Sequence, residues 1–127
     1  MKFLIDTHVL LWAAFEESSL SRIALQILQS DAEILVSAAS AWEVATKYRL
    51  GRLDHARDLI EDFVPQVLAS GYQFLSISPE HALRAGRFDV DHKDPFDRML
   101  AAQAVHEDMV LLSSDKQLDQ FNVRREW

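Results

Sequence analysis

The stretch KFLIDTHVLLWAAF, residues 2–15, decides the fold of this chain. It begins with a short, mostly apolar run at residues 2–5, which Asp6 and Thr7 bring to an end. Apolar residues and helix formers follow from Val9 to Ala14, so the pattern predicts a buried strand that turns directly into a helix. We therefore expect an α/β fold in which Asp6 stands at the carboxyl end of a strand.

The rest of the chain repeats this alternation of strand and helix. Further strands are predicted at residues 33–37, 73–77 and 109–112, with an edge strand at 121–125. Helices are predicted after Ser21, over 39–50, in two stretches within 55–70 divided by Pro65, over 79–87, and after Asp94. The β-α-β order predicts a three-layer α/β/α architecture with a mostly parallel sheet of four to five strands. Trp12 and Trp42 fall among apolar helical positions and are expected in the core or at an interface.

Composition limits the class of protein. The 127 residues, of which 49% are hydrophobic, predict a single domain over residues 1–127 with a substantial core. The absence of cysteine excludes disulfides, thiolate zinc sites and cysteine nucleophiles, and it fits a cytoplasmic protein. No apolar run reaches the roughly 18 residues that a membrane-spanning helix needs, so no membrane partner is expected.

The charge is unevenly distributed. A net charge of -7 is not typical of a protein that attracts nucleic acid by its overall charge. Basic residues nevertheless cluster locally at Lys47, Arg49 and Arg52. This cluster is our candidate for a surface that binds an RNA backbone, and a solvated helix end is the alternative interpretation.

Four separated acids carry the chemical signal of the sequence. Asp6 and Asp115 follow predicted strands, whereas Glu43 and Asp97 lie near the starts of predicted helices. In an open parallel sheet, all four positions belong to the edge where the strands end and ligands bind. Carboxylates gathered in one place repel one another unless a cation neutralises them. The pattern predicts a site for a hard divalent cation, Mg²⁺ or Mn²⁺.

Each acid also has a purely structural interpretation. Asp6 and Asp115 have the position of helix N-caps. Glu43 precedes Lys47 by four residues, the favourable spacing for a surface ion pair. Four independent caps or ion pairs need not gather at one edge of one sheet, however, and that coincidence favours the metal site.

Several polar neighbours are candidates for supporting roles. Thr7 and Ser114 carry hydroxyls beside the acids and either orient a carboxylate or serve as ordinary turn residues. Arg98 is a phosphate clamp or an exposed partner of a nearby acid. His8 and His92 are expected to be exposed or hydrogen-bonded, because an oxygen-rich site for a hard cation does not require imidazole.

Four stretches in this order resemble the motifs of PIN-domain ribonucleases, and within that family the VapC-type toxins of type II toxin-antitoxin pairs. They are Phe3-Leu4-Ile5-Asp6-Thr7, Ser40 to Lys47 (SAWEVATK), Asp94 to Ala104 (DPFDRMLAAQA), and Leu111 to Asp115 (LLSSD). The resemblance runs from Phe3 to about Val123, nearly the whole chain.

The resemblance implies which residues form the site. It assigns catalysis and metal binding to Asp6, Glu43, Asp97 and Asp115. Asp97 stands directly before the alanine-rich part of its helix at the spacing that the family uses, so Asp94 is left as a cap or a supporting residue. Asp119 is the weaker rival of Asp115.

The resemblance also implies the chemistry and the partners. It implies hydrolysis of RNA phosphodiester bonds, with one or two Mg²⁺ or Mn²⁺ ions that activate water and neutralise the phosphate, leaving a 5′-phosphate and a 3′-hydroxyl. Asp6 and Asp97 are the expected direct ligands, and Glu43 and Asp115 would bind through water or hold a second ion. An RNA substrate, a cognate antitoxin protein and a homodimer are the implied partners.

Two other hypotheses remain. A catalytically silent PIN-like module would bind RNA or protein without cleaving it, although the presence of all the family acids argues against it. A signalling receiver domain has a similar length and an acidic Mg²⁺ pocket. It would normally show a second acid beside the first and a lysine after the last core strand, whereas this chain has Thr7 and Asp115 at those places.

Overall fold

A five-stranded parallel sheet forms the centre of the molecule, in the order β3-β2-β1-β4-β5. The computed structural model describes all residues, 1–127. The strands are β1 Lys2–Ile5, β2 Glu33–Ser37, β3 Gln73–Leu75, β4 Val110–Leu112 and β5 Arg125–Glu126. The predicted α/β/α architecture is confirmed, and the sheet is parallel throughout rather than mostly parallel.

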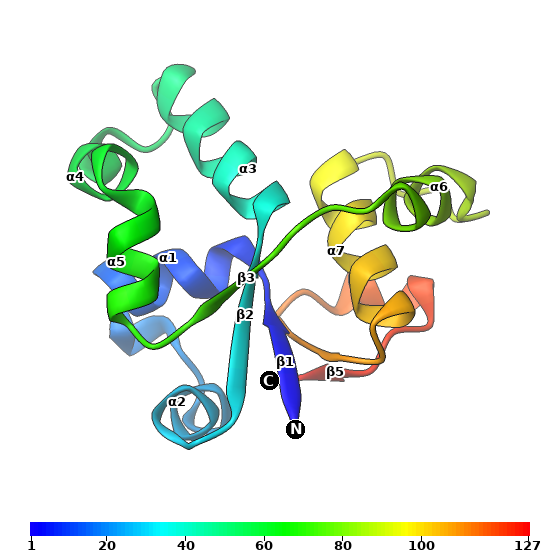
Figure 1. Cartoon of the computed structure of the whole chain (residues 1–127), viewed down its shortest axis with the longest axis horizontal. Helices are drawn as coiled ribbons and strands as arrows, with labels where there is room; N and C mark the ends of the chain where they lie inside the picture. Colours follow the sequence, from blue (N-terminus) through cyan, green and yellow to red (C-terminus); the bar gives the residue numbers. More distant parts are fainter.

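Helices cover both faces of this sheet (Figure 1). One layer contains α1 (Thr7–Phe15), α2 (Arg22–Gln29) and α5 (Phe63–Ala69), and the other contains α6 (Pro79–Arg87) and α7 (Pro95–His106). Helix α3 (Ala38–Arg49) continues directly from β2 and contacts both α1 and α7, while α4 (Arg57–Glu61) packs on α3. Three short 3-10 helices complete the chain: η1 Glu17–Ser19, η2 Asp54–Ala56 and η3 Lys116–Phe121. No helix combines the length and the apolar character that crossing a membrane requires.

The sheet divides the core in two because successive side chains of a strand point to opposite faces. Phe3 and Ile5 pack with Val9 of α1, whereas Leu4 packs with Leu100 of α7. The central strand is thus buried on both sides, which explains its continuous apolar run. Its register pairs Ile5 with Leu112, and the polar residues that follow the two strands therefore emerge side by side.

The predicted helix starts are confirmed by their caps. The side chains of Ser21, Ser78 and Asp94 each accept a hydrogen bond from a backbone N–H in the first turn that follows, at 3.0, 3.1 and 2.9 Å. These bonds satisfy donors that have no partner inside the helix. Gly51 follows α3 with φ of 75°, the left-handed conformation expected for the residue that ends a helix.

Some expectations are corrected by the structure. Pro65 does not divide the helices, because the break falls at Asp62 and Pro65 lies in the first turn of α5, where no helical acceptor awaits its missing N–H. The strand expected over 73–77 ends at Leu75. The edge strand expected over 121–125 is instead Arg125–Glu126, because Phe121 is buried at the end of η3. Of the two places expected for Trp42, the core is excluded because the residue is 61% exposed, and an interface remains.

Candidate metal centre

Asp6 lies at the carboxyl end of β1 and is buried, with 3% of its surface exposed. Its side chain makes no capping bond to α1, and its Oδ2 instead accepts a hydrogen bond of 2.7 Å from the hydroxyl of Ser113. Burial raises the pKa of Asp6 above its ordinary value, the bond from Ser113 opposes this, and repulsion by Glu43 adds to it. The capping interpretation of this acid is therefore wrong, and its carboxylate belongs to a buried cluster.

Glu43 is the second buried acid, on α3. Its Oε2 accepts a hydrogen bond from the ammonium of Lys47 at 2.5 Å, but its Oε1 is buried and has no hydrogen-bond partner. With 3% of the Glu43 side chain exposed, this is not the surface ion pair that the spacing suggests. A buried carboxylate oxygen without a partner is unfavourable, and a bound cation would supply the missing interaction.

Asp97 lies in the first turn of α7, and its Oδ2 is 2.9 Å from Nε2 of His92. Burial raises the pKa of Asp97 to about 6, against a lowering by the His92 hydrogen bond, while repulsion from Asp94 and Asp6 raises it further. Asp94 is exposed and uses its Oδ1 to cap the helix through the N–H groups of Phe96 and Asp97. Of the two neighbouring acids, Asp97 is thus the partly buried one that feels the charge of Asp6, and Asp94 caps α7.

Asp115 lies at the margin of the cluster and is only partly buried. Its N–H donates to the Ser113 hydroxyl that also binds Asp6, which links the two segments. Its Oδ1 accepts a hydrogen bond of 2.9 Å from the N–H of Gln117, so this acid does cap η3. The rival Asp119 is held by a bidentate pair with Arg125 on the exposed side of η3.

The sequence matches the family model of the PIN domain over residues 3–123. The chain belongs to the PIN domain family. Among curated proteins, it is 29% identical over 116 residues to Ribonuclease VapC22 of Mycobacterium tuberculosis, an alignment that covers 91% of this chain and 88% of that protein.

Solved structures of toxin-antitoxin proteins share the PIN fold of this chain. VapBC2 from Rickettsia felis, bound to a DNA fragment from its promoter, superposes with a TM-score of 0.73 and 14% identity, over 99% of this chain and 98% of that one. VapBC-1 from nontypeable Haemophilus influenzae gives a TM-score of 0.69 with 16% identity, over 99% and 97% of the two chains. At these identities the likeness supports the fold alone.

The acids of this PIN domain fit a hard divalent cation. The donor set consists of carboxylate oxygens, the type that Mg²⁺ and Mn²⁺ prefer. Asp6, which is buried, and Asp97, which is partly buried, both resist ionisation, and Glu43 keeps one buried oxygen without a partner. These three residues would hold the ion, and Asp115 lies partly buried at the margin of the group.

The supporting hydroxyl is Ser113, which the sequence analysis missed in favour of Ser114. Ser114 makes no hydrogen bond to an acid, whereas Ser113 is fully buried between Asp6 and the N–H of Asp115. Strand pairing predicts this partner, since Ser113 directly follows β4 and must lie beside Asp6, which directly follows β1. The Thr7 hydroxyl does not reach an acid either, because it donates to Ser40 on α3 at 2.9 Å, although the Thr7 backbone N–H acts to lower the pKa of Asp6.

Arg98 fulfils neither of the roles expected for it. Its guanidinium donates to backbone carbonyls from the end of α6 and the loop that follows, and it makes no ion pair with an acid. The side chain is thus occupied within the protein and is not free to clamp a phosphate. In the basic cluster, Lys47 is similarly engaged with Glu43, while Arg49 and Arg52 are exposed and unpaired.

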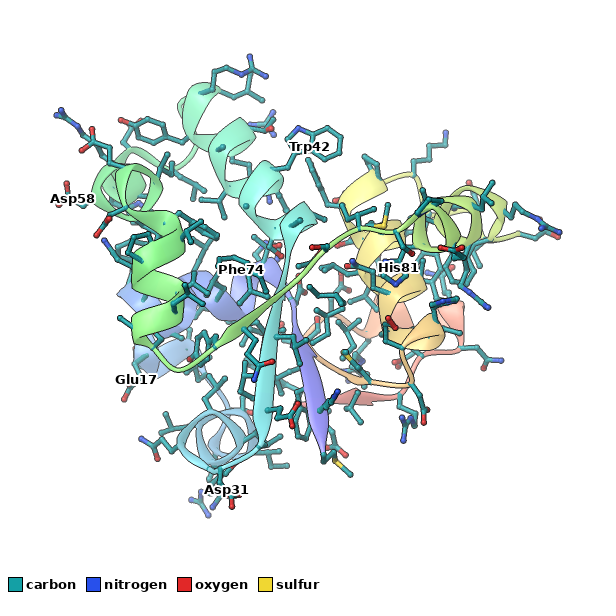
Figure 2. All side chains as sticks on the ribbon, in the orientation of Figure 1. Glu17, Asp31, Trp42, Asp58, Phe74 and His81 are labelled. Atoms are coloured by element: carbon teal, nitrogen blue, oxygen red, sulfur yellow. The ribbon has the colours of Figure 1, made fainter.

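A second group of possible ligands lies at the other end of α7. It is the one group of three in which a ligand atom from each residue lies within 4.8 Å of the others: His81 on α6 (Figure 2), His106 and Glu107. The acids beside β1 are not gathered this closely. Nδ1 of His81 accepts a hydrogen bond of 3.0 Å from the N–H of Ser78, so a neutral ring carries its proton on Nε2. Nε2 lies 3.7 Å from Oε1 of Glu107 and is buried without a hydrogen-bond partner, but in this tautomer it has no lone pair to offer a metal. The acids beside β1 are therefore the stronger candidate for a metal centre.

Proposed function

We propose that this PIN domain is a Mg²⁺- or Mn²⁺-dependent endoribonuclease and the toxin of a type II toxin-antitoxin pair. The observation that carries the proposal is the trio of Asp6 and Glu43, both buried, and Asp97, partly buried, whose charges the protein neutralises only in part. Lys47 is the one lysine or arginine paired with an acid of the trio. A divalent cation would remove the repulsion and satisfy the free oxygen of Glu43.

Each residue has a distinct task in this proposal. Asp6 and Asp97 are direct ligands, Glu43 is the third ligand on α3, and Asp115 acts through water or holds a second ion. The bound ion would lower the pKa of the attacking water and neutralise charge on the scissile phosphate. Ser113 fixes the orientation of Asp6, and the products would carry a 5′-phosphate and a 3′-hydroxyl.

Cleavage of total cellular RNA in Mg²⁺ or Mn²⁺ tests this function. We expect the parent protein to cleave and Asp6→Asn and Asp97→Asn to lose at least about 100-fold in rate, since each removes a ligand charge at the reaction centre. Asp31→Asn is the matched control, because Asp31 is exposed and lies at the opposite end of the sheet (Figure 2). EDTA should abolish cleavage by the parent.

Two outcomes would contradict the proposal in different ways. Equal cleavage by the parent and both site variants would remove the acids from the mechanism. A parent that binds RNA but cleaves none under any metal condition would favour the catalytically silent module.

The partners follow from the relatives rather than from the geometry. The structures of VapBC complexes support a cognate antitoxin as a partner of this chain. We also propose a homodimer, which rests only on the resemblance to VapC-type toxins. Co-expression with the product of an adjacent small gene, followed by size-exclusion chromatography with light scattering, tests both. A monomer that remains active in the presence of that product would contradict them.

A further inference from the structure

Arg98 is the most heavily hydrogen-bonded side chain of the protein, and it directly follows Asp97 in α7. Its guanidinium donates to the carbonyls of Ala85, Phe88, Val90 and His92, at 2.9, 2.6, 2.9 and 3.0 Å, and lies 3.5 Å from that of Gly86. A guanidinium presents its donors in a fixed planar arrangement, so these bonds define the path of the loop from residue 88 to residue 92. The same turn of α7 that carries Asp97 therefore also anchors this loop.

The anchored loop delivers His92 to the metal centre. Nε2 of His92 lies 2.9 Å from Oδ2 of Asp97, and 11% of the His92 side chain is exposed. The ring also packs edge-on against Phe121, with centroids 5.5 Å apart at 79°, and Phe121 in turn contacts Phe88 and the guanidinium of Arg98. Packing and hydrogen bonding thus fix the imidazole in place before any ligand binds.

Resting on the proposed function, we propose that His92 is a positioning residue for Asp97 and that Arg98 holds His92 in that role. The terminal torsion of an aspartate is soft, so a carboxylate without a partner samples many orientations. The bond from Nε2 to Oδ2 fixes one oxygen and leaves Oδ1 free to bind the cation together with Asp6. Groups that hydrogen-bond a ligating carboxylate typically change metal affinity by about 10- to 100-fold.

Mn²⁺ binding to the RNA-free protein, followed by electron paramagnetic resonance of the free ion, tests this role without reference to cleavage. His92→Ala should weaken Mn²⁺ binding by about 10- to 100-fold while circular dichroism shows a folded protein. His92→Gln should restore most of the affinity, because its amide N–H reaches nearly the place of Nε2. The control is His55→Ala, at an exposed position on η2 that belongs to neither group of possible ligands.

A double-mutant comparison tests the part played by Arg98. Arg98→Lys keeps the charge but cannot reach the same set of carbonyls, so it should weaken Mn²⁺ binding in the parent and have little further effect in His92→Ala. Additive losses would show that Arg98 acts independently of His92 and would overturn that part of the proposal.

The remaining outcomes separate this inference from the proposed function. If His92→Ala binds Mn²⁺ as tightly as the parent, or if His92→Gln is as weak as His92→Ala, the positioning role is refuted and the metal centre stands. If the parent does not bind Mn²⁺, or Asp97→Asn binds it equally well, the metal centre itself fails.

Discussion

Replacing Asp97 by asparagine should stabilise the metal-free protein while it abolishes metal-dependent cleavage. In the folded protein the pKa of Asp97 is raised from 3.8 to about 6, first by burial and then by its acidic neighbours. Between these values the folded state holds more protons than the unfolded state, so stability falls as pH rises and the loss is complete above the folded pKa. The full shift would correspond to roughly 3 kcal/mol of unfolding free energy at pH 7.5, and solvent screening of this partly exposed side chain reduces the cost to about 1 to 2 kcal/mol.

The amide of asparagine removes this cost at nearly constant volume and still accepts the hydrogen bond from His92. Urea denaturation in EDTA at pH 7.5 should therefore show Asp97→Asn to be more stable than the parent by about 1 to 2 kcal/mol. In a domain of this size, a gain at the upper end corresponds to a rise in unfolding temperature of roughly 7 °C. The gain should shrink as pH falls from about 6 toward 4, where the parent carboxyl becomes protonated.

Asp31→Asn, at an exposed position without a partner, is the control for loss of one negative charge and should change stability by less than about 0.5 kcal/mol. A destabilised Asp97→Asn protein, or a gain that is the same at pH 4.5 and pH 7.5, would refute the argument. It would mean that the carboxylate is already neutralised within the folded chain and that no cation is needed.

Three further changes probe the same centre. Ser113→Ala removes the donor to Asp6, so Mn²⁺ affinity measured by calorimetry should fall by about 10-fold or more, and an unchanged affinity would contradict the role of this hydroxyl. Lys47→Met leaves Glu43 buried without a counter-charge, so urea unfolding in EDTA should show that the unfolding free energy falls by about 3 kcal/mol. Saturating Mn²⁺ should reduce this loss, and a loss insensitive to Mn²⁺ would count against a bound ion. Arg98→Ala should lower the unfolding free energy by at least about 2 kcal/mol in the same assay, because several carbonyls lose a charged donor. The control, exposed Arg49→Ala, should lower it by less than about 0.5 kcal/mol, and an equally small loss for Arg98→Ala would contradict the anchoring role of Arg98.

The sequence by itself determined the alternation of elements and most of their starts. Residues 2–5 form a strand because an apolar run of that length must be buried on both faces of a parallel sheet, and Ser21, Ser78 and Asp94 begin helices because their short polar side chains satisfy free N–H groups. These effects act over a few residues and are therefore visible in the pattern. The same local logic placed Asp6 after the first strand and Asp97 in the first turn of α7.

The tertiary structure decided what each polar side chain does, because that depends on contacts between distant segments. Burial distinguishes Asp97 from Asp94, three residues earlier, and the pairing of β1 with β4 selects Ser113 over Ser114 as the partner of Asp6. Lys47 and Arg98 look like surface cations in the sequence, yet one is committed to a buried carboxylate and the other to a set of carbonyls. Local propensity gives the positions of the acids along the chain, but desolvation and strand register, which set their charge and orientation, arise only when the sheet has formed.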